Sequence, residues 1–451
     1  MKLFYWLFTA FVGALVLGLS IFYLNGMPDL KFGSAAEEGA IEVVDSNTFD
    51  QVLLIRDVNS DELTVTLSFP YGEAHNRFAE GLAHYTEHLA WLNAFLGSTD
   101  AADRQAHSNA QTTKFTTSYW LRSTPDELRK TISDLVRVAD PIELEQSFAK
   151  EERGIVLREY EMRVAENAWY PLWDELMRDV HDHGPLARSV IGHPKDIAQY
   201  SYDEAKELHQ ATHQLGDATL IVYGNVTPER LKESLSRLTP SIVTPDTKKR
   251  AEIFLADLEP LDDTQSITAP RIVSDGVMYL NYAPVPDCGS MATCDLLAWL
   301  AVWVLDSPME GGLAGPLRFD DFVARDFSFD VNMIGPSHAM IEFWAVPDKG
   351  ATPVDIDVAL KRVLNTTFLD GVPKASFERA KKQLGEYLET FDYPEYYNFD
   401  QTTALLSRGA EVYSYAEEVQ ALKAIELQDL NAFLAKFSND SRSLTRYVYM
   451  H

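Results

Sequence analysis

Strand-like and helix-like segments follow one another in a similar order twice along this chain, before and after a proline-containing stretch at residues 239–268. In the first half we expect strands at 51–57, 62–69, 113–121 and 218–224 and helices at 77–95, 125–138, 144–166 and 228–238. In the second half we expect strands at 276–282, 326–333, 339–346 and 444–449 and helices at 294–306, 353–365, 376–391 and 427–437. The sequence therefore predicts an α+β fold of two similar domains, residues 45–238 and 269–451, each a mixed β-sheet flanked by helices, with a linker at 239–268.

The N-terminal segment contains no charged side chain from Leu3 to Leu24. At about 1.5 Å per residue, a helix of that length crosses a hydrocarbon core of about 30 Å. A cleaved signal peptide is the alternative, although its apolar core is usually only about 7–15 residues long. We expect a single transmembrane helix at 1–25 and a linker at 26–44. Because Lys2 precedes the span and Asp29 follows it, we expect the N-terminus in the cytoplasm and the body in the periplasm of a bacterium, tethered to the cell membrane.

The formal net charge of −29 excludes nucleic acid as a partner, because phosphate binding requires a basic surface. An acidic surface either attracts basic peptides or simply keeps the protein well solvated. The two cysteines, Cys288 and Cys294, lie close together in a turn-rich segment. They are either a small disulfide loop, as expected in an oxidising compartment, or two buried thiols.

The segment His84-Tyr-Thr-Glu87-His88 carries the strongest chemical signal. Positions i, i+3 and i+4 share one face of a helix, so these three polar side chains project together. Two imidazoles one turn apart can hold a zinc ion, and a carboxylate beside them can act as a general base toward water. Other histidines lack such an acidic pattern, and we interpret His181, His183, His209 and His213 as surface or helix-face residues.

A hydrolytic zinc site needs a third protein ligand, and the predicted helix at 144–166 offers four glutamates. Glu152 and Glu159 are two helical turns apart and share a face, but Glu151 and Glu161 are also available. Composition alone does not choose among them. We expect the apolar residues Ile155, Val156 and Met162 to pack on the other side of this helix.

The inverted order H-x-x-E-H, followed some seventy residues later by E-R-x-x-V-L-x-E, resembles the M16 family of metallopeptidases. The resemblance extends to GLAHYTEHLA around the motif, to Ser108-Asn109-Ala110 before a threonine-rich strand, and to the segments 190–197 and 218–226. It covers residues 45–235 well and 270–451 more loosely. It implies that each domain pair is half of a clam-shell chamber and that extended peptides are hydrolysed.

The resemblance also implies roles for individual residues. One Zn²⁺ per chain would be held by His84, His88 and Glu159, with Glu87 as the general base and Glu152 as a second acidic catalytic residue. Asn109 and Ala110 would lie on the strand whose free edge pairs with substrate. Arg318 would contact the substrate carbonyl. Seven positions later the family has a tyrosine with the same task, and here that position holds Arg325.

A chain of this length carries only half of the chamber, so the resemblance implies a partner. We expect a heterodimer with a second M16-like subunit that brings an Arg/Tyr pair, in preference to a homodimer. The leading hypothesis is a membrane-anchored zinc endopeptidase acting on extended peptides or unfolded polypeptides. The alternatives are a non-catalytic M16-like structural or assembly subunit of a membrane protein complex, and a zinc-dependent peptide-binding module without turnover.

Overall fold

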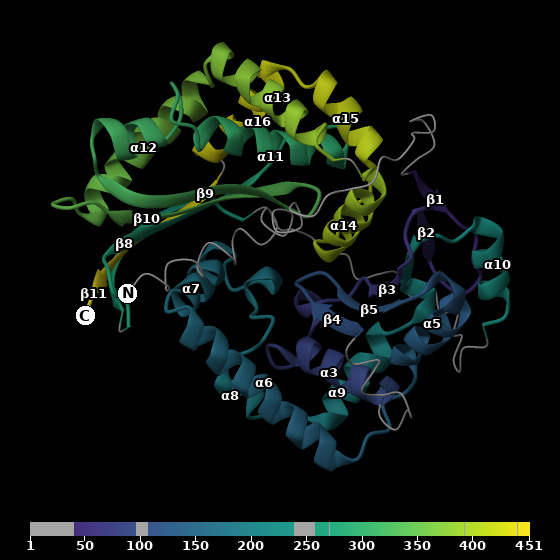
Figure 1. Cartoon of the computed structure of the whole chain (residues 1–451). Helices are drawn as coiled ribbons and strands as arrows, with labels where there is room; N and C mark the ends of the chain where they lie inside the picture. Colours follow the sequence, from purple (N-terminus) through teal and green to yellow (C-terminus); the bar gives the residue numbers. More distant parts are fainter. Residues whose placement is uncertain (1–39, 96–106, 239–257, 270, 392, 440) are drawn as a thin grey trace.

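The computed structural model describes residues 40–95, 107–238, 258–269, 271–391, 393–439 and 441–451, which form two α+β domains (Figure 1). The N-terminal domain is built on a six-stranded sheet with the order β1-β2-β6-β3-β5-β4, and the C-terminal domain on a five-stranded sheet with the order β7-β11-β8-β10-β9. Their strands are β1 (Ile41–Val43), β2 (Gln51–Arg56), β3 (Leu63–Phe69), β4 (Ser108–Thr112), β5 (Thr117–Ser123), β6 (Thr219–Gly224), β7 (Leu261–Ala269), β8 (Gly276–Pro284), β9 (Ala324–Ile334), β10 (His338–Pro347) and β11 (Arg442–Met450). Each sheet contains one parallel pair, β2–β6 and β7–β11, among antiparallel pairs. The predicted α+β class with mixed sheets is confirmed.

Helices cover one face of each sheet and bury its apolar side chains. The N-terminal domain carries α3 (Leu82–Phe95), α5 (Leu128–Leu135), α6 (Gln146–Glu166), α8 (Pro194–Ile197), α9 (Tyr202–Thr212) and α10 (Pro228–Ser236). The C-terminal sheet is covered by α11 (Met291–Leu305), α12 (Pro353–Asp370), α13 (Lys374–Leu388), α15 (Tyr415–Ala424) and α16 (Leu427–Asn439), which stack above it in Figure 1. Helix α11 is apolar nearly all round because it packs against β9 on one side and against α13, α15 and α16 on the other.

Apolar and polar side chains alternate along β9, as expected for a strand with helices packed on only one of its faces. Phe329, Val331 and Met333 point into the helical core, whereas Ser328 and Asp330 point to the opposite face. The central strand β3, by contrast, is buried at every position. It lies between β5 and β6, and its two faces are both covered.

Each half of the chain also lends one helix to the other half. Helix α7 (Tyr170–Val180), from the N-terminal half, packs Leu176 and Val180 against the C-terminal sheet. Helix α14 (Pro394–Ser407), from the C-terminal half, packs Phe399 and Leu406 against the face of the N-terminal sheet that the other helices leave open. This exchange buries apolar surface in both directions and fixes how the domains lie relative to one another (Figure 1).

Buried arginines of β11 strengthen the contact with α7. Arg442 donates to the carbonyl oxygens of Val180 and Asp179, at 2.9 and 3.1 Å. Arg446 donates to the Asp179 carboxylate at 2.7 Å. Such charge-assisted bonds in a desolvated interface are stronger than those between neutral groups.

Several sequence predictions need correction. The strand expected at 113–121 begins at Thr117, because the Oγ1 of Thr113 accepts from the backbone N–H groups of Phe115 and Thr116 and closes a turn there. The helix expected from residue 77 begins only at Leu82. Residues 261–269, most of which were assigned to the linker, form the edge strand β7. Most of its side chains are exposed, so the sequence shows no alternation of apolar and polar residues there. Met162 is 58% exposed and does not pack behind α6 as expected, whereas Val156 is fully buried.

Two other predictions concern the cysteines and the N-terminus. Cys288 and Cys294 form a disulfide, which resolves the alternative that the sequence left open. The predicted transmembrane helix at 1–25 lies outside the described residues. Among the residues that are described, no helix is long and apolar enough to cross a membrane.

Candidate active site

Helix α3 presents three polar side chains on one buried face. His84 and Glu87 are only 9% and 5% exposed, and His88 is half-buried. Because they occupy positions i, i+3 and i+4, their ligand atoms all lie within 4.8 Å of one another. The Nε2 atoms of the two imidazoles are 3.3 Å apart. In the described ranges, no other group of three or more His, Cys, Asp or Glu side chains meets in this way.

Helix α6 brings two of its glutamates to the same place. The Oε2 of Glu159 lies 3.7 Å from Nε2 of His84 and 3.8 Å from Nε2 of His88. Glu152, two turns earlier, places its Oε2 3.0 Å from Nδ1 of His88. Glu151 and Glu161 are exposed on the other side of the helix. Composition could not choose among the four glutamates of this helix. The packing of α6 on α3 does, because it brings Glu152 and Glu159 to the histidines.

The donor atoms suit a zinc ion. Two imidazoles and one carboxylate are a common set for catalytic zinc, with bonds of about 2.0–2.1 Å. Ligand atoms around a tetrahedral ion with such bonds lie roughly 3.3–3.4 Å apart, close to the 3.3, 3.7 and 3.8 Å among His84, His88 and Glu159. Glu152 accepts the proton on Nδ1 of His88, which leaves the Nε2 lone pair directed at the shared position.

Burial sets the protonation of these groups. Burial, together with the neighbouring charge of His88, lowers the pKa of His84 well below its usual value, so this imidazole is neutral and able to bind a metal. The net pKa of His88 is raised. Burial alone would lower this pKa, but the hydrogen bond to Glu152 and the charges of Glu87 and Glu159 outweigh the effect of burial. Burial raises the pKa of Glu87 to about 7. A carboxylate with a pKa near neutrality can both accept and release a proton.

The edge strand β4 lies beside Glu87. Its last residue, Thr112, donates a hydrogen bond of 2.7 Å from Oγ1 to Oε2 of Glu87. Strand β4 ends the sheet order, so among the described strands none pairs with its outer edge, which can accept another strand. On that strand Asn109 is exposed, and its Oδ1 accepts from the backbone N–H of Ala110 at 2.9 Å. The strand can therefore present main-chain groups next to a possible base.

Comparisons with known proteins agree with this geometry. Residues 51–194 match the family model described as Insulinase (Peptidase family M16). The chain is 26% identical over 216 residues to the mitochondrial-processing peptidase subunit beta of Neurospora crassa, which covers 44% of each protein. It is 25% identical over 193 residues to an uncharacterized zinc protease of Rickettsia felis, which covers 40% of this chain and 45% of that one. These matches support the M16 peptidase family.

Solved structures show the same M16 fold over nearly the whole chain. A putative M16-like peptidase from Alicyclobacillus acidocaldarius aligns with a TM-score of 0.69 at 15% identity, over 91% of this chain and 98% of that one. The periplasmic protease PqqL from Escherichia coli aligns with a TM-score of 0.70 at 15% identity, over 92% of this chain but only 48% of its own. The matches to the two curated relatives cover less than half of each relative's length.

The two C-terminal residues that the M16 resemblance implicated, Arg318 and Arg325, belong to the C-terminal domain. Arg318 is exposed in a short π-helix, Gly315–Asp320, of the C-terminal domain. Its charge partly offsets the burial that raises the pKa of Asp306 in the same domain to about 6. Arg325 is exposed in β9.

Thr112 and the burial of three histidines were not predicted from the sequence. Thr112 follows Asn109 by three positions in a threonine-rich segment, but only the strand register shows that it reaches Glu87. His181, His209 and His213 were interpreted as surface or helix-face residues, and all three are buried, so the surface alternative is wrong for them. His213 bonds to Tyr119 at 2.8 Å, and His209 to the carbonyl oxygen of Val138 at 2.8 Å. Partners far away in the sequence satisfy these two rings, so no local pattern indicates their burial.

Proposed function

We propose that this chain is the zinc-bearing, half-size subunit of an M16 metalloendopeptidase that cleaves extended peptides or unfolded polypeptides. The observation that carries the proposal is the meeting of two imidazole nitrogens, 3.3 Å apart, with the Glu159 carboxylate at 3.7 and 3.8 Å. Glu87 shares the face of the helix that presents the imidazoles. This arrangement combines a metal site with a base beside it.

In this mechanism His84, His88 and Glu159 hold one zinc ion per chain. Bound there, zinc would supply Lewis acidity that makes water a better nucleophile and polarises a carbonyl. Glu87 accepts the proton of the attacking water and returns it to the departing amine. Glu152 keeps His88 in the required tautomer, which makes it essential to the site without touching substrate.

The substrate would bind as an added strand on the open edge of β4. Main-chain pairing suits an extended peptide of any sequence and places a peptide bond near Glu87. The bond between Asn109 and the N–H of Ala110 must then open, because that N–H is needed for a substrate carbonyl. Arg318 is proposed to act on the carbonyl of a substrate held in a closed chamber.

A partner subunit completes the proposal. The larger periplasmic protease PqqL has about twice the length that this chain covers, which supports a chamber made of two such halves. With Arg325 in place of the family tyrosine, this chain lacks one carbonyl-orienting group. A heterodimer with a second M16-like subunit carrying an Arg/Tyr pair would supply it, and a homodimer would not.

We further propose that residues 1–25 anchor the protein in the cell membrane as a single pass, with the N-terminus in the cytoplasm and the body in the periplasm. The disulfide between Cys288 and Cys294 supports an oxidising compartment. The uncharged run from Leu3 to Leu24 supports the anchor.

Zinc content and hydrolysis of an unstructured peptide, measured together, test the function. The wild-type chain with its partner should bind one zinc and cleave the peptide. Glu87→Gln should retain zinc and lose hydrolysis, because the ligands remain and the base is gone. Unchanged hydrolysis by Glu87→Gln would refute the mechanism.

A non-catalytic structural or assembly subunit is the second candidate, and the arginine at position 325 favours it. Such a protein would co-purify with a membrane complex and show no zinc-dependent turnover with any M16-like partner. A peptide-binding module would bind zinc and peptide equally well in wild-type and Glu87→Gln protein. Zinc content and hydrolysis, together with peptide binding and co-purification, therefore separate all three functions.

A further inference from the structure

The first turn of α3 has no side chain of its own to cap it. Gly81, which precedes the helix, has a φ of +83°. A Cβ at this position would lie 2.2 Å from the hydroxyl oxygen of Tyr200 and 2.4 Å from the backbone nitrogen of Gly192. Serine, threonine and aspartate, the usual capping residues, are therefore excluded there. The N–H of Leu82 donates to the carbonyl oxygen of Ala79 at 3.2 Å, but the N–H groups of Gly81 and Ala83 need an acceptor from elsewhere.

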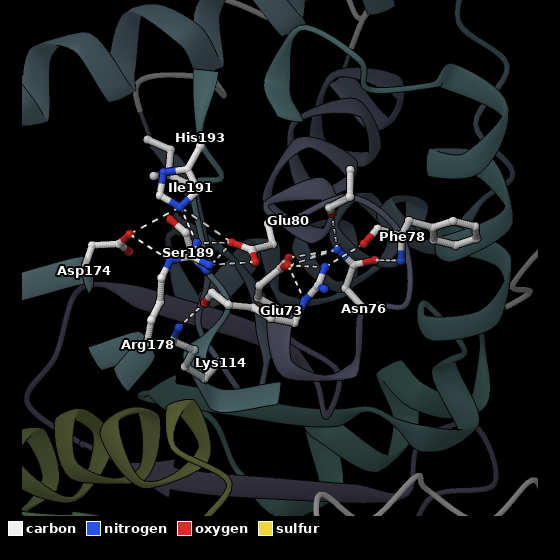
Figure 2. Close-up of polar contacts among 12 residues, drawn as sticks. Glu73, Asn76, Phe78, Glu80, Lys114, Asp174, Arg178, Ser189, Ile191 and His193 are labelled. Atoms are coloured by element: carbon white, nitrogen blue, oxygen red, sulfur yellow. Dashed lines mark hydrogen bonds and ion pairs between the residues drawn. The ribbon is translucent and has the colours of Figure 1, made fainter. Parts of the chain in front are cut away.

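Glu73, outside the helix, supplies that acceptor. Its side chain is fully buried, and its carboxylate accepts hydrogen bonds from the backbone N–H groups of Gly81 and Ala83, the latter at 3.4 Å. Asn76 donates to both carboxylate oxygens, at 3.0 and 3.1 Å, and Arg188 donates at 3.1 Å. Figure 2 shows Glu73 and Asn76 pointing toward one another in this network.

A second ion cluster holds the loop that leads into the helix. Glu80 receives two hydrogen bonds from Arg178 of α7 and one of 3.2 Å from the backbone N–H of Ser189 (Figure 2). Arg178 also contacts Asp174 and His193. Glu80 therefore links the residue before Gly81 to α7, the helix that also contacts the C-terminal sheet.

This network lies close in sequence and space to the proposed metal site. His84 directly follows Ala83, whose N–H Glu73 holds, and His88 follows one turn later. The other ligand, Glu159, comes from a different helix, so the distance between the ligands depends on how α3 is placed. A shift of a few tenths of an ångström in the first turn of α3 is passed directly to the imidazole of His84.

We propose that Glu73 is a positioning residue of the metal site: its buried carboxylate serves as a remote cap of α3 and fixes His84 relative to Glu159. The proposal rests on the proposed function for the identity of the metal. Its structural part, the placement of the first turn of α3, stands independently of catalysis.

Glu73→Gln is the most informative variant. All the groups around the carboxylate are donors, from Asn76, Arg188 and the helix backbone. A glutamine keeps the shape but turns one acceptor into a donor that faces other donors. The matched control is Asp295→Asn in the C-terminal domain, where a carboxylate that is only 7% exposed accepts from Arg408 and from the Tyr413 hydroxyl at 2.7 Å.

Four quantities are measured on each protein well below its unfolding temperature: the Kd for zinc, kcat and KM with the partner present, and the hydrogen-exchange rates of the α3 amides. Glu73→Gln should weaken zinc binding and lower kcat about tenfold each, leave KM unchanged, and speed exchange in the first turn of α3. Asp295→Asn should lower the unfolding temperature but leave zinc binding and α3 exchange within twofold of wild type.

If Glu73→Gln loses stability like the control while its zinc Kd and α3 exchange stay within twofold of wild type, the proposal is wrong. If the wild type binds zinc but does not cleave peptide, the proposed function fails while the Kd comparison still decides this inference. If the wild type binds no zinc, α3 exchange alone decides the structural part. Should Glu73→Gln not fold, Asn76→Ala, which removes the amide group that donates to both carboxylate oxygens, should show the same changes to a smaller extent. Its failure to do so would equally overturn the proposal.

Discussion

The hydroxyl of Thr112 lies 2.7 Å from Oε2 of Glu87 and joins the open edge strand β4 to the motif helix α3. The strand proposed to hold the substrate therefore also holds the proposed base. In the buried site this bond restricts the Glu87 carboxylate to one orientation. Hydrogen bonds to charged groups of this kind typically contribute about 1.5–3 kcal/mol.

Replacing Thr112 by valine keeps the shape of the side chain and removes the hydroxyl. We expect kcat to fall about tenfold, with KM and zinc content unchanged, because the base loses its orientation while the ligands and strand edge remain. Thr112→Ser should restore most of the rate, since it keeps the hydroxyl. Equal rates for Thr112→Val and wild type in steady-state assays would show that this bond has no catalytic role.

The second prediction concerns the partner. The body alone, residues 26–451, should bind zinc yet cleave peptides poorly, because half of the chamber and a carbonyl-orienting tyrosine are absent. Each missing oxyanion donor costs about 100–1,000-fold in rate. Adding a second M16-like subunit with an Arg/Tyr pair should raise turnover and produce a heterodimer by light scattering. Full activity from a monomer, or from a homodimer whose rate Arg318→Ala leaves unchanged, would contradict this prediction.

Glu418 gives a pH prediction away from the site. Burial raises the pKa of this carboxyl from 4.5 to about 7, although Tyr397 donates to it at 2.7 Å. The folded state therefore binds the proton more tightly than the unfolded state. The contribution of Glu418 to the free energy of unfolding is fully present below pH 4.5 and is lost as the pH rises through 7. The loss amounts to at most about 3 kcal/mol. In urea unfolding, the free energy of unfolding should fall less between pH 5 and pH 8 for Glu418→Gln than for wild type. An equal fall in the two proteins would show that Glu418 does not cause the pH dependence.

The disulfide gives a fourth prediction. Cys288 and Cys294 are six positions apart, so the closed loop is short and the chain-entropy contribution is only about 2 kcal/mol. A reducing agent should lower the unfolding temperature of the wild type by a few degrees and leave the Cys288→Ser/Cys294→Ser variant unaffected. If the reductant shifts both proteins equally in calorimetry, the bond contributes nothing to stability.

Local patterns predicted the strands and the motif face well, because spacing along one helix determines which side chains meet. His84, Glu87 and His88 are an example: their convergence needs only the helical period. Selecting Glu159 over Glu161 required either the family resemblance or the packing of α6 on α3. The contacts of Thr112 and Glu73 depend on strand register and on loops, and local periodicity does not encode either one.

Long-range exchange between the domains was also invisible in the sequence. Helices α7 and α14 each pack on the sheet of the other domain, so their apolar faces are explained by residues roughly ninety positions away or more. The turn at Thr113–Thr116 was mistaken for strand because its threonines have high β propensity. The hydroxyl oxygen of Thr113 instead accepts from the backbone N–H groups of Phe115 and Thr116 and closes a turn before the strand.

X-ray absorption of the zinc-loaded protein tests the central claim most directly, because it reports the atoms bound to the metal. For wild type we predict one zinc per chain with two imidazole nitrogens and a carboxylate oxygen at about 2.0–2.2 Å. Glu159→Ala should lose the metal or the carboxylate ligand, and Glu161→Ala, an exposed neighbour on the same helix, should match wild type. A Glu159→Ala protein with stoichiometric zinc and an unchanged spectrum would contradict the ligand set proposed for this site.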